Sequence, residues 1–352
     1  MRLNLWGLVE LVAEPAGRWA DEVARALGPD VVRLGTSMRS EARTRVDVRF
    51  VERLEMTGLR ELTHGVYVGD RIVADTQYGV RITGRPGVLR LEATAPALEW
   101  VFWGVALALL EAGATFVHCA GLARDGQAVL LPSWGGVGKT AIVAHLVRGK
   151  GYSLLGDDLV IVDRDGWCFP FPKPFVLYGY HRPLFPEVFE KGRGPMAPTA
   201  LGAALSVAAR GVKPLLRPLP AVLQLARRLN PQSQPVAPSD ILGRDALAEP
   251  ARLARVIWFE RGGVEVTDRP IGVGDLATRI LGSTSHEFDV RAVALTNVLF
   301  GVGLLGFEGT QGRWHHILVT ALGRVDRRKL TLPADWSLDR VAGQVAAVVD
   351  RA

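Results

Sequence analysis

Several features that identify common classes of protein are scarce in this chain of 352 residues. It has only two cysteines, Cys119 and Cys168, too few for a disulfide framework or a cysteine-based zinc site. Long apolar runs are also missing. The most apolar stretch, residues 100–110, is too short to cross the roughly 30 Å hydrocarbon layer as a helix. These absences argue against a disulfide-rich secreted scaffold and predict no membrane insertion.

The N-terminus lacks the pattern of a signal peptide. Glu10 and Glu14 interrupt its short apolar run, whereas a signal peptide has an unbroken apolar centre followed by a small-residue cleavage site. Together with the low cysteine content, this predicts a cytoplasmic protein.

Acidic residues are absent from one segment, and this explains the basic character of the chain. The formal net charge is +6, from 42 Lys and Arg against 36 Asp and Glu. Residues 192–239 contain six basic residues and no acidic one, so this segment alone equals the net excess. Because the rest of the chain is near neutral and does not interleave aromatic with basic residues, we expect no nucleic-acid partner.

The sequence changes in character near Pro96, which divides it into two predicted parts. Residues 1–95 combine short alternating strands with Gly and Pro turns and predict a small N-terminal α+β domain without a chemical motif. Residues 96–352 predict an α/β domain that carries a basic, proline-rich insertion at about residues 191–240. The insertion is either a solvated excursion or a basic flap that contacts the substrate.

The apolar periodicity predicts the main elements. In the first part we expect a helix at residues 19–27 and strands at 45–51 and 66–73. In the second part we expect helices at 98–112, 139–148, 271–281 and 338–351, and strands at 115–122, 128–132, 153–158, 255–259 and 314–321. The pairs Asp125-Gly126 and Asp165-Gly166 predict two tight hairpins.

The strongest motif is a glycine-rich loop between a predicted strand and a predicted helix. Glycines let consecutive backbone N–H groups turn toward a phosphate, and the helix N-terminus adds positive potential. Lys139 would bridge the β- and γ-phosphates, and the Thr140 hydroxyl would ligate Mg²⁺. Ser133 stands where the Walker pattern has its first glycine and has less freedom at positive φ. The predicted ATP phosphate site consists of Ser133, Gly135, Gly136, Val137, Gly138, Lys139 and Thr140.

Two adjacent acids, Asp157 and Asp158, end the strand predicted after this helix. In a phosphate-loop fold that strand returns beside the loop, so the pair should emerge near the phosphates. One carboxylate can hold Mg²⁺ while the other accepts a proton from a substrate hydroxyl. Neighbouring side chains of a strand point to opposite faces, so both acids can serve only if the backbone bends there.

Other polar residues give weaker signals. Lys173 and Arg182 follow the second hairpin, where a cation could stabilise phosphate charge. The run at residues 283–287 carries hydroxyls and a histidine but lacks the glycines of a nucleophile elbow. His315 and His316, on a predicted strand, would point to opposite faces and form no two-histidine metal site.

The series His118, glycine loop, Gly-Lys-Thr140 and Leu-Leu-Gly-Asp157-Asp158 resembles the HPr kinase/phosphorylase family and its HPr-kinase-like relatives. The loop is also similar to that of phosphoenolpyruvate carboxykinases. The likeness covers about residues 110–170. Ser133 and Gly135 stand where the family usually has Gly and Ser. The glycine- and arginine-rich signature found downstream in HPr kinase/phosphorylases has no counterpart, which weighs against HPr itself as the acceptor.

The resemblance implies a P-loop core of the HPr-kinase and carboxykinase type. It implies that Asp158 is the general base, that Asp157 supports the metal or the base, and that His118 lies near the transferred phosphate, although a lone histidine in an apolar strand is more often a core residue. We therefore expect an ATP- and Mg²⁺-dependent kinase that acts on a hydroxyl, with serine of a peptide or protein as the favoured acceptor. A kinase of a free small molecule and a non-catalytic nucleotide-binding regulatory module are the alternatives, and the residues leave homo-oligomerisation open.

Overall fold

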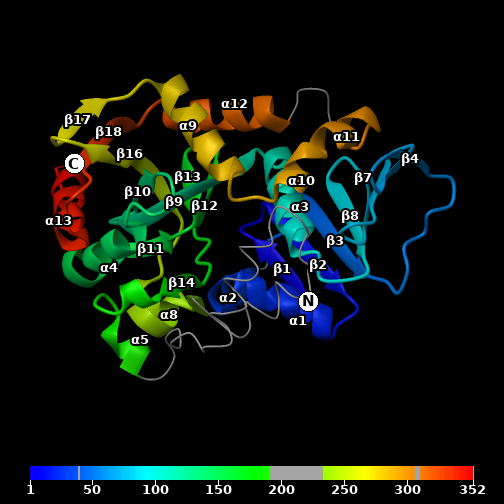
Figure 1. Cartoon of the computed structure of the whole chain (residues 1–352), viewed down its shortest axis with the longest axis horizontal. Helices are drawn as coiled ribbons and strands as arrows, with labels where there is room; N and C mark the ends of the chain where they lie inside the picture. The colour runs from blue at the N-terminus through cyan, green and yellow to red at the C-terminus, as the bar shows by residue number, and fades with distance from the viewer. Residues whose placement is uncertain (39, 191–232, 306–309, 352) are drawn as a thin grey trace, which may run out of the picture.

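The chain folds as a mixed α/β protein with two large β-sheets and helices packed on and between them (Figure 1). The structure is a computed structural model and describes residues 1–38, 40–190, 233–305 and 310–351. None of the helices within these ranges combines the length and apolar character needed to cross a membrane.

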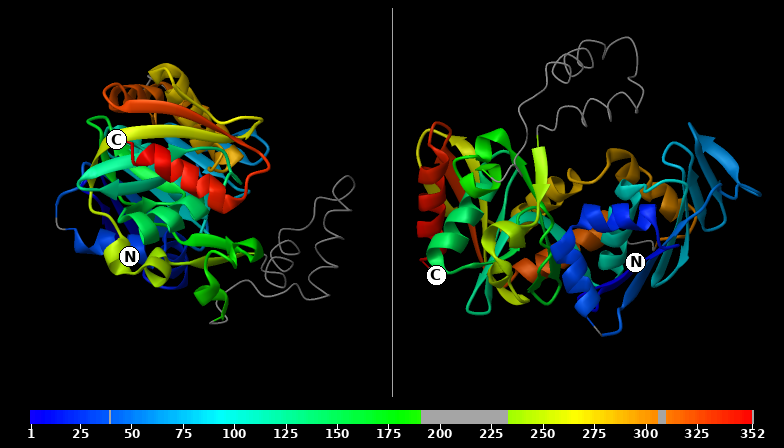
Figure 2. Two further views of the ribbon diagram at one scale, coloured as in Figure 1. Left: turned by 90° about the vertical axis from the view of Figure 1, so that its left-hand side faces the viewer. Right: turned by 90° about the horizontal axis from the view of Figure 1, so that it is seen from below.

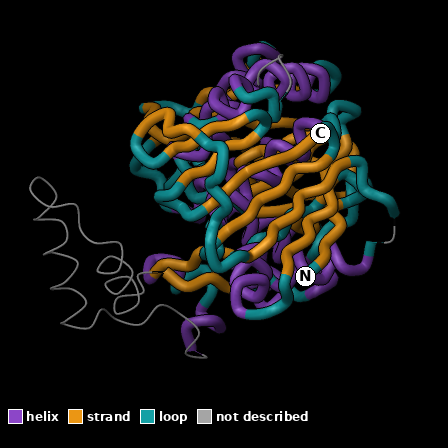
Figure 3. The backbone as a smooth tube through the Cα atoms, turned by 90° about the vertical axis from the view of Figure 1, so that its right-hand side faces the viewer, coloured by secondary structure: helices purple, strands orange, loops and turns teal. Residues whose placement is uncertain are grey.

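The first sheet contains eight strands in the order β1-β2-β3-β8-β7-β6-β5-β4 and forms the near face in Figure 3. β3 pairs in parallel with both β2 and β8, and the other pairs are antiparallel. The strands are β1 (Arg2–Leu5), β2 (Val9–Glu14), β3 (Thr44–Phe50), β4 (Arg60–Thr63), β5 (Val66–Gly69), β6 (Ile72–Asp75), β7 (Val80–Arg85) and β8 (Val88–Ala93). Two helices, α1 (Arg18–Leu27) and α2 (Pro29–Ser37), lie between β2 and β3 in the chain.

The single strand predicted at residues 66–73 is wrong, because a hairpin divides it. β5 and β6 pair antiparallel with Gly69 opposite Ile72. Only two residues make the turn, and Arg71 adopts a left-handed φ of 53° there. A two-residue turn keeps the alternation of apolar residues nearly intact on both sides, so the pattern read as one strand.

The second sheet has the order β10-β9-β12-β13-β16-β18-β17, with β11 also paired to β9. An additional parallel pairing joins β10 to β16, so the first five strands of this order form a closed circuit of neighbours. The strands are β9 (Ala114–Arg124), β10 (Gln127–Pro132), β11 (Ser153–Gly156), β12 (Leu159–Asp163), β13 (Trp167–Phe169), β16 (Ala251–Gly263), β17 (Thr267–Pro270) and β18 (Asp326–Pro333). A separate hairpin joins β14 (Phe175–Tyr178) to β15 (Ser233–Val236).

Helix α3 (Leu98–Glu111) packs between the two sheets, since it contacts β3 and β8 on one side and β9 on the other. It is apolar on nearly every face and has ten buried residues, as a helix with no solvent face requires. One continuous apolar core therefore joins the first sheet to the second. Whether residues 1–95 form a separate domain stays a prediction.

The remaining helices cover the second sheet. α4 (Lys139–Lys150) and the C-terminal helix α13 (Leu338–Val349) lie side by side, as both views of Figure 2 show. α9 (Val273–Ser285) packs on α12 (Thr310–Leu322) and on β9. The shorter helices are α5 (Pro186–Glu190), α8 (Pro238–Leu242), α10 (Val290–Ala294), α11 (Thr296–Gly301) and the 3₁₀ turns η1 (Gly179–His181) and η2 (Arg244–Ala246).

The strand predicted at residues 314–321 is wrong, because this segment lies inside α12. Its buried residues recur with the helical period, at Trp314, Ile317, Leu318, Ala321 and Leu322. His315 and His316 are therefore neighbours on a helix. Both predicted hairpins are confirmed: Asp125 and Gly126 have φ values of 53° and 76° between antiparallel β9 and β10, and Gly166 has a φ of 82° between β12 and β13.

The predicted insertion is described only at its end. Residues 233–242 form β15 and α8 rather than loop. The predicted basic flap lies outside the described residues, with its five named side chains Arg210, Lys213, Arg217, Arg227 and Arg228.

Candidate active site

The glycine-rich loop connects β10 to α4. Gly136 and Gly138 take left-handed φ values of 77° and 102°, and Gly138 is the residue that precedes α4. A Cβ at position 138 would lie 2.8 Å from Leu338 Cδ2, the end of a side chain that can shift, so the left-handed backbone rather than space favours glycine there. Ser133 is fully buried and has no left-handed φ, so this backbone position does not need a glycine.

Lys139 is the first residue of α4 and folds back over the loop. Its Nζ lies 3.4 Å from the Ser133 carbonyl, the Ser133 hydroxyl and the Trp134 carbonyl. Burial lowers the pKa of Lys139, while Asp157 and Asp158 oppose that effect. The ammonium group therefore stands between the loop and the acidic pair.

The two aspartates point in different directions because β11 ends at Gly156 and the backbone bends at residues 157–158. Asp157 Oδ2 accepts a hydrogen bond of 2.7 Å from the Thr140 hydroxyl. Its Oδ1 is buried and has no hydrogen-bond partner among the residues that the structure describes. Burial raises the pKa of Asp157 to about 7, and the Thr140 hydrogen bond offsets part of this rise.

Asp158 pairs with a lysine instead. Lys173 Nζ donates a hydrogen bond of 2.7 Å to Asp158 Oδ2. Burial alone would raise the pKa of Asp158, but Lys173, with smaller contributions from His118 and Lys139, lowers it below the ordinary value. Asp158 is thus an ionised carboxylate at neutral pH.

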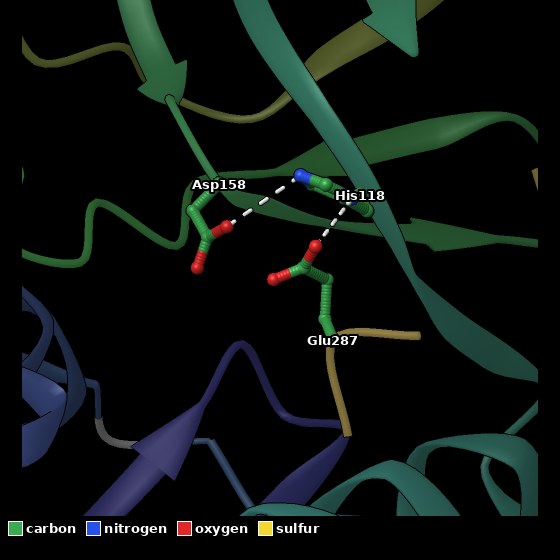
Figure 4. A group of neighbouring side chains, drawn as sticks. All are labelled: His118, Asp158 and Glu287. Atoms are coloured by element: carbon green, nitrogen blue, oxygen red, sulfur yellow. Dashed lines mark ion pairs between the residues drawn. The ribbon is translucent and has the colours of Figure 1, made fainter. Parts of the chain in front are cut away.

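His118 lies on β9 between two carboxylates (Figure 4). Its Nε2 is 3.7 Å from Asp158 Oδ1, and its Nδ1 is 3.0 Å from Glu287 Oε1. Burial, followed by the charge of Lys139, lowers the pKa of His118 to about 4, so the imidazole is neutral at pH 7. Burial raises the pKa of Glu287, and the charge of Asp158 adds to this rise.

A cavity of about 620 Å³ brings most of the predicted site residues together. Its walls include His118, Gly135, Gly136, Gly138, Lys139, Thr140, Asp157 and Asp158. Ser133 and Val137 are buried beneath the loop rather than in the wall. Lys173 also lines the cavity, whereas Arg182 is not among its lining residues.

Sequence reasoning missed two charged residues of the cavity wall, Arg261 and Glu287. Arg261 donates hydrogen bonds from Nη2 to the backbone carbonyls of Ala334 and Trp336. Glu287 ends the polar run at residues 283–287, which begins within the last turn of α9, after the buried apolar residues Leu276, Ala277 and Ile280. That abrupt change from apolar to polar residues was a signal for this segment, although it does not single out Glu287.

Comparisons with known proteins add no relative: no protein-family model and no curated protein matches this chain.

Proposed function

We propose that the protein transfers the γ-phosphoryl group of ATP to a hydroxyl group, with serine of a peptide or protein as the acceptor. The observation that carries the proposal is the convergence on one cavity of the glycine loop, Lys139, the Thr140–Asp157 pair and Asp158. These are the parts that phosphoryl transfer needs: backbone donors and a lysine for the phosphates, hard oxygen ligands for a cation, and a base for the nucleophile.

The residues present fit Mg²⁺. Asp157 Oδ1 is a buried carboxylate oxygen that finds no hydrogen-bond partner in the described part of the chain, and Thr140 Oγ1 lies 2.7 Å from the other oxygen of the same carboxylate. Mg²⁺ prefers such oxygen ligands and commonly uses one or two carboxylates together with substrate phosphates. Thr140 and Asp157 would hold the ion, and the bound ion would supply charge neutralisation at the phosphates.

The chain's own residues would divide the remaining tasks. The backbone N–H groups of the loop and the start of α4 would bind the phosphates, and Lys139 would swing from the loop to the β- and γ-phosphates. Asp158 would accept the proton of the acceptor hydroxyl. As it does so, the hydroxyl oxygen bonds to the γ-phosphorus, and the bond between the γ-phosphorus and the ADP oxygen breaks. Lys173 would keep Asp158 ionised before that step.

The order of elements supports a P-loop core of the HPr-kinase-like type as part of this proposal. β10 leads into the loop, the loop into α4, and α4 into β11, which ends beside the acidic pair. β9 carries His118 next to Asp158. We also propose that the protein is cytoplasmic.

The test is a transfer assay with labelled ATP, Mg²⁺ and a set of serine peptides and small hydroxyl compounds. Asp158→Asn should lower kcat about 10²- to 10⁴-fold while nucleotide still binds, because only the base is lost. Lys139→Ala should weaken nucleotide binding and transfer together. Lys150→Ala at the other end of α4 is the matched control and should leave both unchanged.

Two outcomes would contradict the proposal. If the wild type binds ATP but transfers nothing to any acceptor, the protein is a regulatory module. If small molecules accept the phosphoryl group and peptides do not, the assignment of the acceptor is wrong.

A further inference from the structure

One short segment at the end of α9 holds His118 by both its backbone and its ring. The Thr284 hydroxyl accepts a hydrogen bond of 2.9 Å from the His118 backbone N–H, across 166 residues of sequence, and Thr284 is fully buried. Glu287, two residues after the end of α9, approaches the imidazole, with Oε1 3.0 Å from Nδ1. Thr284 at the backbone and Glu287 at the ring thus fix His118 from one segment.

The two carboxylates lie against different nitrogens of the ring. Glu287 Oε1 is 3.0 Å from Nδ1, whereas Asp158 Oδ1 is 3.7 Å from Nε2 (Figure 4). His118, Asp158 and Glu287 have ligand atoms within 4.8 Å of one another. A single metal ion, however, binds one nitrogen of an imidazole and draws its ligands to about 3.3 Å from each other, as bonds of 2.0–2.1 Å require. A carboxylate at each nitrogen instead fits an imidazole with two separate roles. One carboxylate fixes which nitrogen carries the proton, and the other nitrogen faces the second carboxylate.

We propose that Glu287 is a positioning residue, whose carboxylate keeps the proton of the His118 imidazole on Nδ1 and so presents Nε2 to Asp158 as a hydrogen-bond acceptor. The inference about the tautomer stands on this geometry alone. Its consequence for catalysis rests on the proposed function, in which Asp158 is the base. Lys139 and Lys173 are the cations that face the same group, and both disfavour a second proton on the ring.

Geometry also explains why the proton belongs on Nδ1. Nδ1 is buried and makes no well-aligned hydrogen bond within the described part of the chain, and Glu287 Oε1 lies only 3.0 Å from it. A carboxylate oxygen at that distance repels a nitrogen lone pair and attracts a proton, and Glu287, with a side chain 32% accessible, has water to stabilise its charge. The Nε2–Asp158 distance of 3.7 Å is too long for a hydrogen bond and leaves that nitrogen available. An acceptor nitrogen beside Asp158 would stabilise this carboxyl once it carries the proton of the acceptor hydroxyl.

The first experiment reads the tautomer directly by long-range ¹H–¹⁵N correlation on the full chain labelled at histidine. His118→Gln assigns the signal. The wild type should show the Nδ1–H tautomer. Glu287→Gln, which keeps the size of the side chain, should lose this preference, because an amide can donate to Nδ1 as well as accept from it. Glu52→Ala, which removes an exposed carboxylate from the first half of the chain, should change nothing.

The second experiment measures transfer. Glu287→Ala should lower kcat about tenfold or more without changing the KM for ATP. Added formate should restore part of the rate and the Nδ1–H signal, which a purely structural role of Glu287 would not allow.

The outcomes separate the two proposals. An unchanged tautomer in Glu287→Gln would overturn the role of Glu287 even if the kinase is real. A wild type that transfers nothing would overturn the kinase, and the tautomer would still decide the inference. A Zn²⁺ titration that shifts the His118 signal in the wild type and not in Glu287→Gln would replace the positioning role by a metal site.

Discussion

Replacing Asp157 with Asn should make the protein more stable at alkaline pH although it removes a proposed ligand of Mg²⁺. Burial raises the pKa of the Asp157 carboxyl to about 7 from an ordinary value of 3.8. Between these two pH values the folded protein holds a proton that the unfolded chain has released. The free energy of unfolding must therefore fall as the pH rises from about 4 to 7, and stay low above that. Asparagine carries no charge at any pH and does not suffer this loss.

The size of the effect follows from the pKa difference. Each unit is worth about 1.4 kcal/mol, so a difference of about three units corresponds to about 4 kcal/mol over the whole window. Between pH 5 and pH 8 the wild type should lose about 2–3 kcal/mol relative to the variant. In a protein of this size that equals a relative change in Tm of about 3–4 °C.

The assay compares thermal melts of the wild type and Asp157→Asn at pH 5 and pH 8 in buffers without divalent cations. Other titrating groups are common to both proteins, so the difference between the two isolates Asp157. Asp245→Asn removes an exposed aspartate and should give a difference that does not depend on pH. A stability gain of Asp157→Asn that is equal at both pH values, or a loss that grows with pH, would refute the reasoning.

Three further predictions address the neighbours of the cavity and the contact between α10 and the first sheet. Lys173→Met should raise the pKa of Asp158 and move the acidic limb of the kcat/KM profile up by about one pH unit or more, and an unmoved limb would contradict the pairing at 2.7 Å. Arg291→Met should lower the free energy of unfolding by about 3–5 kcal/mol in denaturant melts, because it leaves the fully buried Asp75 carboxylate without its ion-pair partner. Combining it with Asp75→Asn should recover part of that loss. A single variant Arg291→Met as stable as the wild type would refute the account. Thr284→Val should cost about 1–3 kcal/mol by leaving the His118 N–H unpaired, measured as a lower Tm, whereas Thr278→Val on the exposed face of α9 should not.

Sequence patterns predicted the elements whose signal is local. The Asp125-Gly126 turn needs two residues at positive φ, and the start of α4 needs a flexible glycine before Lys139, so a few neighbouring residues specify each. The prediction failed at α12, where Val319 and Thr320 favour a strand locally while burial of Trp314 and Leu318 against the core selects a helix. Tertiary packing determined that this segment is a helix, and local propensity alone could not have predicted it.

The candidate site divides in the same way. Lys139, Thr140 and the acidic pair lie on consecutive elements of one strand–loop–helix–strand unit, so their spacing along the chain predicts their convergence. Glu287 reaches the cavity only because α9 packs against β9 and buries Thr284 at the His118 backbone. Contacts between residues so far apart in the sequence depend on how the helices pack on the sheet. A single sequence does not reveal that packing.

Gly156 shows how one residue resolves what the sequence left open about the acidic pair. On a regular strand Asp157 and Asp158 would point to opposite faces, and one of them would leave the site. A Cβ at position 156 would lie 2.3 Å from the Leu159 carbonyl oxygen and 3.2 Å from that of Phe171, so only glycine permits the backbone to approach so closely and to turn there. Because the chain bends directly after Gly156, one carboxylate reaches Thr140 while its neighbour reaches Lys173 and His118. The glycine before the two acids thus belongs to the site as much as the glycines of the loop, since it lets both adjacent carboxylates line the same cavity, as the proposed division of roles between cation and acceptor requires.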